Sequence, residues 1–413
     1  MDIVVEPGTQ HRNRLALRPF RGLRYNVDEI TDLGAVTSPP YDVMDRAMID
    51  ELLRQHPRNI VRLVLPRLVA DPVRTDSPYA QAAKLLSRWI DSRVLLTDAE
   101  PALYVYEYGA PDYRVCGLVG ALELTEPTER IVLPHEDVIP DIVADRLAMM
   151  TAAQANLEPI LLVYDGAGAT HDIVEAVRAS SPLLDVGACD GTVHRLWSIT
   201  DPIQLRKITK LLEPHQALIA DGHHRYATYL ELRRRARQGG ASSGPWDRGL
   251  ALLIDQSRYP LQLGAIHRSV SEVSLDSLRV PAGFHISEPD SIGDRAQGAP
   301  TKAREVVATD GFANRTITLP GRTQEVVTDA ELVHDQLLRT WRVDEHRVGY
   351  HHTVEQALRA ARQDGGVAIL LHPPSLHQVV AVARTGRMLP RKSTSFGPKP
   401  RTGLVMRRFA AER

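Results

Sequence analysis

The sequence has little cysteine, few aromatic residues and no long apolar run. Its 413 residues include 2 Cys, and Phe, Trp and Tyr together make up 5%. Two cysteines, Cys116 and Cys189, are too few for a disulfide framework or a cysteine-rich metal site. The longest apolar runs, such as Val367–Leu371, are far shorter than the ~20 residues that cross a bilayer, and the first residues lack the basic start and apolar run of a secretory signal. We therefore expect a cytoplasmic protein without a membrane partner.

The rest of the composition is that of an ordinary globular protein. Hydrophobic residues make up 43% of the chain and charged residues 24%, values that exclude wholesale disorder. The chain is longer than one ordinary domain of roughly 100–200 residues. The segment 288–300, rich in Asp, Ser, Gly and Pro, is the best internal boundary. We predict a main domain over 1–290 and a C-terminal α/β region over 301–413.

The formal charge of -1 hides a basic C-terminal segment. Residues 381–413 contain nine Lys or Arg and one acid, Glu412, which gives this segment a charge of +8. A local excess of this kind suits a small anionic or phosphorylated ligand, RNA or DNA, while a solvated basic surface explains it equally well. No helix-turn-helix or zinc-finger signature accompanies it, so a nucleic-acid partner stays open without a motif to support it.

Apolar periodicity predicts strands alternating with helices, and hence a mixed α/β or α+β fold with mixed sheets. Two segments, 102–108 and 114–124, are separated by a turn containing Gly and Asp and predict a β-hairpin. Tyr104, Tyr106 and Tyr108 alternate with other residues along the first segment, which indicates a strand with one packed face and one exposed face, with a base-stacking platform as the alternative. Helices are predicted to begin at Asp45 and Ser77 and to cover 141–155, 202–212, 225–238, 328–341 and 374–384.

The most informative segment is Asp-Gly-His-His-Arg at 221–225, which follows a buried strand predicted over 216–220. A strand that stops at Asp-Gly and a helix that starts at two histidines bring together free backbone amides, the positive helix end, two imidazoles and a guanidinium. This combination suits phosphate, with Arg225 semi-exposed in a cleft. Asp221 would hold a magnesium ion, orient His223 or serve as a base. The alternative is that Asp221 is only a helix cap and the histidines are incidental.

A second segment with phosphate-binding side chains is Lys392-Ser393-Thr394, followed by Lys399. It offers two ammonium groups and two hydroxyls in a loop punctuated by Gly and Pro. No Gly-x-x-x-x-Gly precedes it, so it is not a Walker site. A basic surface loop is the alternative. We predict that this loop folds back beside the Asp-Gly-His-His-Arg segment, because isolated basic turns gain affinity for phosphate only by converging.

Glu136, in a predicted loop beside His135, is the preferred general base, and a solvated loop acid is the alternative.

The histidines also allow a competing interpretation, a mono- or dinuclear metal centre like those of metal hydrolases. Its spacing support is poor, because the sequence has no His-x-x-x-His pair and no His-Glu-x-x-His helix. The residues of this constellation are His135, His215, His223, His224, His267 and Asp221.

Motifs distributed along the chain are distinctive in combination. They are Leu17-Arg18-Pro19-Phe20-Arg21-Gly22-Leu23-Arg24-Tyr25, Pro39-Pro40-Tyr41-Asp42-Val43, Asn59-Ile60-Val61-Arg62-Leu63, His135-Glu136, Asp145-Arg146-Leu147, Asp221-Gly222-His223-His224-Arg225-Tyr226 and Met388-Leu389-Pro390-Arg391-Lys392-Ser393-Thr394-Ser395-Phe396-Gly397-Pro398-Lys399. Together they resemble the bacterial and archaeal "domain of unknown function 1015" family over nearly the whole chain. The activity of that family is not established, so the resemblance implies a context and no reaction.

The Asp-Gly-His-His-Arg segment is also similar to the phosphate-binding motif of the ParB–sulfiredoxin superfamily, which includes sulfiredoxins, CTP-binding partition proteins and nucleotide-dependent free-serine kinases. In those proteins a Gly-x-His-Arg-like turn at a helix start holds nucleotide phosphate. The resemblance places Gly222, His224 and Arg225 on the phosphates, with Asp221 and His223 beside them. His223 stands where sulfiredoxin has its cysteine, so the resemblance does not imply sulfur repair.

These observations predict a nucleotide-dependent, kinase-like phosphotransferase that acts on a small hydroxyl-bearing metabolite such as serine. Asp221 or Glu136 would take the acceptor proton, and Mg²⁺, with Asp221 as a ligand, would bridge oxygens of a nucleoside di- or triphosphate. The alternatives are a nucleotide-binding regulatory switch without metabolite turnover and a His/Asp metal-dependent hydrolase. The predicted catalytic residues are Asp221, Glu136 and His223, and the predicted phosphate ligands are Gly222, His224, Arg225, Lys392, Ser393, Thr394 and Lys399.

Overall fold

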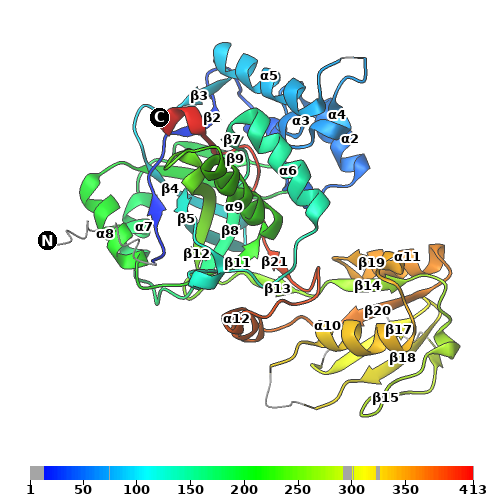
Figure 1. Cartoon of the computed structure of the whole chain (residues 1–413). Coiled ribbons are helices and arrows are strands. Elements are labelled where there is room, and N and C mark those ends of the chain that lie inside the picture. Colours follow the sequence, from blue (N-terminus) through cyan, green and yellow to red (C-terminus); the bar gives the residue numbers. More distant parts are fainter. Residues whose placement is uncertain (1–13, 74, 292–299, 301, 322–325, 413) are drawn as a thin grey trace, which may run out of the picture. The chain divides into compact units, whose positions relative to one another are not determined.

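The computed structural model describes residues 14–73, 75–291, 300, 302–321 and 326–412 (Figure 1). The chain divides into two compact units. Unit 1 comprises Met1–Leu133, Ile139–Pro260 and Lys399–Arg413, and unit 2 comprises Pro134–Val138 and Leu261–Pro398. Most of the predicted boundary segment, 288–300, lies outside the described residues, and the domains 1–290 and 301–413 stay a prediction.

Unit 1 is built around a mixed sheet that has nine strands among its described residues. The strands are β1 Leu17–Arg18, β4 Leu103–Ala110, β5 Tyr113–Glu123, β6 Val132–Leu133, β8 Ile160–Tyr164, β9 Leu184–Gly187, β10 Val193–Ile199, β11 Ala217–Asp221 and β12 Arg248–Asp255. Their order is β6-β11-β8-β12-β5-β4-β10-β9, with β1 pairing to β5. Two neighbouring pairs, β6 with β11 and β8 with β12, are parallel, and the others are antiparallel.

The predicted hairpin is confirmed as β4 and β5, whose register pairs Tyr106 with Gly117. The prediction of one exposed face on its first strand is wrong. Tyr104 and Tyr108 are 0% exposed, and Glu107, on the opposite face, is 2% exposed. The reason is the position of β4 between β5 and β10 in the interior of the sheet, where both faces are covered.

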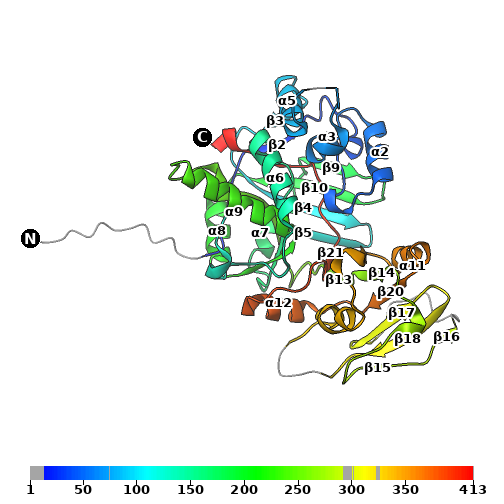
Figure 2. The same ribbon diagram turned by 45° about the vertical axis from the view of Figure 1, so that its right-hand side comes forward.

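The helices of unit 1 join two buried clusters. α7, α8 and α9 share one cluster with the large sheet, whereas α5 and α6 pack with a small sheet of order β3-β2-β22-β7. α6 lies beside α9 (Figure 2). The helices are α1 Leu33–Val36, α2 Arg46–Gln55, α3 Val61–Val64, α4 Pro66–Val69, α5 Pro78–Asp91, α6 Pro140–Ala153, α7 His171–Arg178, α8 Pro202–Leu212 and α9 His223–Gln238, and the small sheet consists of β2 Gly22–Tyr25, β3 Leu95–Thr97, β7 Ala155–Asn156 and β22 Met406–Arg408.

Side-chain caps set the predicted helix starts. Asp45 accepts a hydrogen bond from the Met48 amide at the start of α2, and Ser77 accepts one from the Ala80 amide at the start of α5. Both predicted starts are thereby confirmed. None of the helices in the described residues combines the length and the apolar character needed to cross a bilayer.

Unit 2 has a second sheet, of order β15-β18-β17-β20-β14-β19 with β16 pairing to β18, and a small pair β13–β21. The capping box predicted at Thr328 is confirmed, but the helix it begins passes into a π-helical stretch, Val333–Leu338. The elements are β13 Gln262–Gly264, β14 His267–Val270, β15 His285–Ile286, β16 Asp290–Ser291, β17 Glu305–Thr309, β18 Ala313–Thr318, β19 Val348–His351, β20 Val367–Leu371, β21 Ser395–Gly397, α10 Asp329–Leu332, α11 Val354–Gln363 and α12 Leu376–Thr385. The chain thus has the predicted mixed α/β fold.

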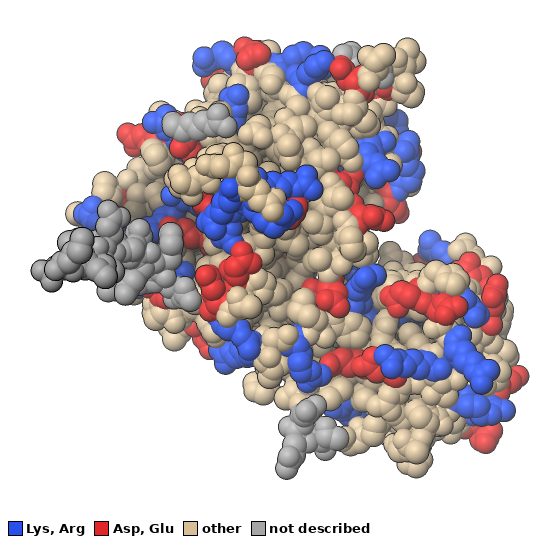
Figure 3. All heavy atoms as spheres, in the orientation of Figure 1, with Lys and Arg blue, Asp and Glu red and all other residues tan. Residues whose placement is uncertain are grey.

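Several basic side chains of the C-terminal segment are buried or form ion pairs inside their own unit. Arg407 is 0% exposed and pairs with Glu412 at 2.6 Å, and Arg401 is 7% exposed. Arg387 pairs with the buried Glu331 at 2.5 Å. On the face shown in Figure 3, Lys and Arg intermingle with Asp and Glu. Part of the local charge that the sequence shows is therefore neutralised by internal ion pairs.

Candidate functional site

A single glycine, Gly222, connects β11 to α9. Gly222 has φ +96, which L side chains rarely adopt, and the helix begins at the next residue. A Cβ at this position would lie 2.9 Å from Ile160 Cγ2 and 3.1 Å from Arg225 Nε. The Tyr226 amide donates to the Gly222 carbonyl at 2.9 Å, which closes the first turn. The predicted strand–turn–helix arrangement is confirmed, and it leaves first-turn amides that have no acceptor within the helix.

Asp221 binds two cations, one on each carboxylate oxygen. Arg225 Nη2 lies 2.5 Å from Oδ2, and Lys399 Nζ lies 2.7 Å from Oδ1. Lys399 also contacts Asp42 Oδ2 at 2.8 Å. The side chains of Asp221, Arg225 and Lys399 are 10%, 4% and 15% exposed. Lys399, the last residue of the predicted basic loop, thus meets the Asp-Gly-His-His-Arg segment within unit 1.

The charges in this cluster stabilise one another. Burial by itself lowers the pKa of Lys399, but Asp221 and Asp42 outweigh burial and raise it. Burial likewise lowers the pKa of Arg225, and Glu158 and Asp221 outweigh it and raise the pKa. Both cations therefore stay charged in a nearly buried site.

Arg225 is more deeply held than the sequence suggests. Its Nη1 donates to the Pro159 carbonyl at 2.7 Å, and its guanidinium lies 5.8 Å from the centre of the Tyr41 ring. Arg225 is 3% exposed, so the expectation of a semi-exposed guanidinium is wrong. The cause is the covering of this side chain by Tyr41 and by the turn before β8. Its Nε is buried and has no hydrogen-bond partner in the described part of the chain.

The two histidines of the motif lie in the first turn of α9. His224 Nε2 accepts a hydrogen bond from the Ile139 amide at 3.0 Å, at the start of α6. An acceptor Nε2 assigns the ring proton of neutral His224 to Nδ1. His223 is buried, with 9% exposure. His224 therefore links the motif to α6, and a phosphate role for either histidine stays a prediction.

The residues around Asp221 do not form a set of ligands for a divalent ion. Both Asp221 oxygens already bind cations, which a metal would have to displace. Within the described residues, no group of three or more His, Cys, Asp or Glu is placed to hold a metal. The histidine constellation suggested by the sequence is thus not gathered there, and the assignment of Asp221 as a magnesium ligand stays a prediction without support from this geometry.

Glu136 and the loop 392–394 come together within unit 2. Glu136 Oε1 accepts hydrogen bonds from the Ser393 and Thr394 amides at 3.0 and 2.9 Å and from Thr394 Oγ1 at 2.8 Å. Glu136 Oε2 accepts one from the Lys392 amide at 3.2 Å. Successive amides of this kind form an anion-binding nest, and Glu136 fills it. The alternative of a solvated loop acid is wrong, because the Glu136 side chain is 13% exposed.

The roles of these unit 2 residues stay predictions. The Thr394 hydroxyl also contacts His135 Nε2 at 2.8 Å, and the Ser393 hydroxyl donates to the Pro390 carbonyl at 2.6 Å. Both hydroxyls are thus engaged inside unit 2. That Glu136 acts as a base, and that Lys392, Ser393 and Thr394 join Gly222, His224 and Arg225 on phosphate, are not tested by these contacts.

Three residues of the cluster were not predicted as site residues from the sequence. Asp42 binds Lys399, Arg146 lies 4.6 Å from the Tyr41 ring centre, and Glu158 accepts from the Tyr41 amide at 3.2 Å. Asp42 and Arg146 occur in motifs of the family resemblance, which was a usable signal. Glu158 had none, because an acid before an apolar strand is common on protein surfaces.

The comparisons with known proteins give a family but no activity. The model of the family described as "Protein of unknown function (DUF1015)" matches residues 17–314. No curated protein matches the chain. Among solved structures, a mutant free serine kinase in complex with ADP has a TM-score of 0.36 at 13% identity and covers 66% of this chain and 89% of its own.

Two further solved structures are similar at the same level. SbnI from Staphylococcus aureus with a C-terminal truncation has a TM-score of 0.39 at 12% identity and covers 69% of this chain and 85% of its own. A conserved hypothetical protein from Pyrococcus furiosus has a TM-score of 0.33 at 15% identity and covers 65% and 87%. Similarities with TM-scores this low carry no argument about function.

Proposed function

We propose that this chain, which belongs to the DUF1015 family, is a nucleotide-dependent phosphotransferase. The family is described as one of unknown function. The acceptor of the transfer would be a small hydroxyl-bearing metabolite such as serine. The observation that carries the proposal is the pair of nearly buried cations, Arg225 and Lys399, fixed on Asp221 at the first turn of α9. A helix start with two such cations is a suitable seat for the phosphates of a nucleoside di- or triphosphate.

The phosphate seat has donors of two kinds. The first-turn amides of α9 supply neutral donors, and Arg225 and Lys399 supply charged ones, each worth roughly 1.5–3 kcal/mol when paired with an anion. The Arg225 Nε–H is buried without an acceptor in the described residues, a state that costs about 1–3 kcal/mol. An anionic ligand oxygen at the Gly222 turn would relieve that cost. This unsatisfied donor supports a ligand here in preference to a purely structural ion pair.

Asp221 acts in this proposal as the residue that positions the two cations. Its oxygens are both occupied, so we assign it no proton transfer and no metal. In the transfer step the acceptor oxygen forms a bond to the terminal phosphorus while the bond from that phosphorus to the nucleotide oxygen breaks. The acceptor proton passes to solvent water. Arg225 and Lys399 balance the charge on the transferring group.

The direct test is acceptor-dependent consumption of nucleotide. Full-length protein is incubated with ADP or ATP and with L-serine, and the nucleotide and phosphorylated products are separated chromatographically. We expect product only when nucleotide and acceptor are both present. Nucleotide binding without consumption, across a panel of hydroxyl-bearing metabolites, would support the regulatory switch in place of the kinase.

Matched variants show whether the phosphate seat is responsible. Lys399→Met should abolish the thermal shift produced by nucleotide, whereas Lys84→Met should leave it unchanged. Lys84 is a suitable control because its side chain is 57% exposed and forms a surface ion pair with Asp76 at 2.7 Å. Nucleotide binding by Lys399→Met as tight as that of the unmodified protein would refute the proposed seat.

A further inference from the structure

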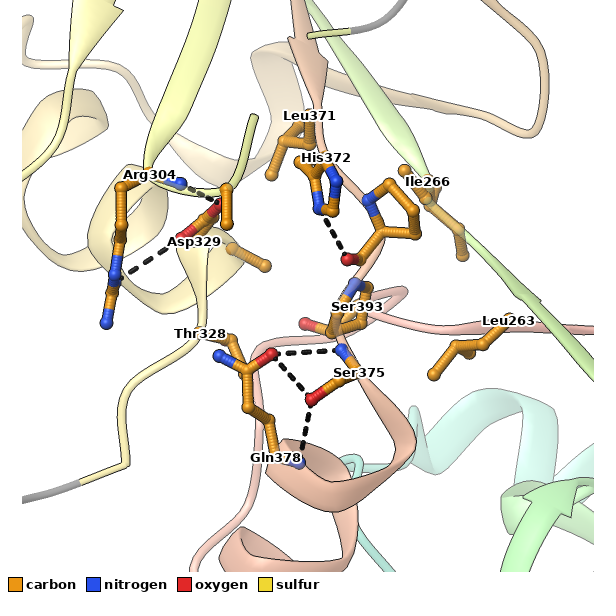
Figure 4. Close-up of a pocket in the computed structure, with 15 residues that line it drawn as sticks. Leu263, Ile266, Arg304, Thr328, Asp329, Leu371, His372, Ser375, Gln378 and Ser393 are labelled. Carbon is orange, nitrogen blue, oxygen red and sulfur yellow. Dashed lines mark hydrogen bonds and ion pairs between the residues drawn. The ribbon is translucent and has the colours of Figure 1, made fainter. Parts of the chain in front are cut away.

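Unit 2 contains a cavity of about 340 Å³, and the described residues that line it all belong to this unit. It lies where the segment leading into β14, the end of β20 and the starts of α10 and α12 meet (Figure 4). A water molecule takes up roughly 30 Å³ in the liquid, so the space equals about eleven waters and falls within the usual ~300–1,000 Å³ of small-molecule sites. Leu263, Ile266 and Leu371 give it an apolar wall.

Asp329 is the one acid among the described residues that line the cavity, and Arg304 forms an ion pair with it. Arg304 contacts it at two points, with Nη1 3.3 Å from Oδ1 and the amide nitrogen 3.2 Å from Oδ2. Both distances are at or beyond the long end of the usual N–H···O range of about 2.7–3.2 Å. Burial raises the pKa of Asp329, and the opposing effect of Arg304 does not cancel the rise. A further cation beside this carboxylate would be stabilising.

His372 also lines the cavity and lies to the right of Asp329 in the view of Figure 4. Its Nδ1 lies 2.8 Å from the Pro373 carbonyl oxygen. A carbonyl only accepts, so Nδ1 carries the proton and Nε2 of the neutral ring accepts. On the opposite wall, Gln378 Oε1 accepts from the Ser375 amide and hydroxyl at 2.9 and 3.0 Å, which leaves its NH₂ group to donate.

We propose that this cavity binds a small aliphatic molecule through a primary ammonium group placed between Asp329 and His372. An ammonium has three donors and no acceptor, which matches a carboxylate and an unprotonated imidazole nitrogen. The aliphatic part of the ligand packs against Leu263, Ile266 and Leu371. The inference goes beyond the proposed function, since neither Asp329 nor His372 belongs to the phosphate seat.

Three probes of similar size test the recognition of the ammonium group. Calorimetric titration of the full-length protein uses 3-methylbutylamine, L-leucine and 4-methylpentanoate. Both compounds with an ammonium should bind and the carboxylate lacking one should not. Tighter binding of L-leucine, whose carboxylate can accept from the Gln378 NH₂, would identify an amino acid as the ligand class. Tighter binding of 3-methylbutylamine would identify a simple amine. Equal binding of 4-methylpentanoate, or no binding of any probe at millimolar concentration, would overturn the proposal.

Variants locate the binding in this cavity. Asp329→Asn keeps an acceptor for Arg304 but removes the charge, and it should weaken binding of the ammonium probe at least tenfold. Asp335→Asn, at a side chain that is 61% exposed, is the control and should change affinity less than twofold. Ala303, an exposed residue of the cavity wall, offers a second variant that leaves Asp329 intact. Ala303→Trp should block entry, so binding unaffected by Ala303→Trp contradicts the proposal even if Asp329→Asn fails to fold.

Discussion

Arg225 combines a predicted chemical role with a structural one that its sequence context does not reveal. Asp221, the Pro159 carbonyl and the Tyr41 ring each contact its guanidinium. The sequence correctly indicates a guanidinium at a helix start beside an aspartate. It cannot indicate burial, because Pro159 and Tyr41 come from distant segments whose approach depends on the whole fold of unit 1.

The first prediction at the residue scale concerns the stability of Arg225 variants. Arg225→Ala should lower the free energy of unfolding by about 3 kcal/mol, because breaking a buried ion pair leaves an incompletely compensated charge. Arg237→Ala, at a side chain that is 53% exposed on the same helix, should stay within about 0.5 kcal/mol. Urea unfolding of both variants checks the difference. Equal effects of the two substitutions would show that Arg225 is not held as described.

The two thiols should differ sharply in reactivity. Burial raises the pKa of Cys116 to about 12, and this residue is 1% exposed, while Cys189 is exposed. The thiolate is the reactive form, so at pH 8 a disulfide reagent should modify one thiol quickly and the second only after denaturation. Cys189→Ser should remove the fast phase entirely. Fast modification of two thiols in the native protein would contradict the burial of Cys116.

At the scale of elements, local signals predicted the framework of the site well. The apolar run before Asp221, the glycine and the polar helix that follows are contiguous, so their order fixes a strand, a turn and a helix. Burial of β4 was not predictable in the same way. It depends on β10, whose residues pair with β4 from about ninety positions further along the chain, as Tyr106 does with Leu196. The contact of Lys399 with Asp221 is likewise long-range.

The turn at Gly222 gives an element-scale prediction with an internal control. Gly222 and Gly240 have similar positive φ values, +96 and +89, but a Cβ at Gly222 would crowd Ile160 and Arg225, while one at Gly240 meets open space. Alanine at either position costs roughly 1–2 kcal/mol of backbone strain. Gly222→Ala should cost more, and it should also weaken nucleotide binding by displacing Arg225. Thermal unfolding and nucleotide titration of the two variants measure the difference, and matching losses would contradict it.

At the scale of the whole molecule, each unit is assembled from separated pieces of chain. Unit 2 includes the short segment Pro134–Val138, and the chain returns to unit 1 at Lys399. The composition of the sequence does not indicate that Pro134–Val138 belongs to unit 2 or that the chain returns to unit 1 at Lys399, because such short segments have no distinct pattern. These two crossings of the chain place Glu136 against the loop 392–394 and Lys399 against Asp221. Both pairings depend on chain topology that a local reading of the sequence does not supply.

Acid should weaken unit 2 before unit 1. Burial lowers the pKa of His194 in unit 1 and of His267 and His334 in unit 2 to about 4, from an ordinary value of 6.5. Between these values the unfolded chain binds protons that the folded chain excludes, so stability is lost as pH falls from 6.5 toward 4. Each histidine contributes on the order of 3 kcal/mol over the full window, and unit 2 carries two of them beside the buried Arg268.

Hydrogen exchange at pH 7 and pH 4.8 measures this loss separately in each unit. Above pH 4.5 most carboxylates keep their charge, so histidine titration dominates the change. Protection in the strands of unit 2 should fall by more than that in β4 and β10. His334→Gln keeps an acceptor for Arg268 Nε, which donates to His334 Nε2 at 3.2 Å, but removes one titrating group and should reduce the pH dependence of unit 2 alone. Earlier loss of protection in unit 1, or an unchanged pH dependence in His334→Gln, would show that these histidines do not control the acid response.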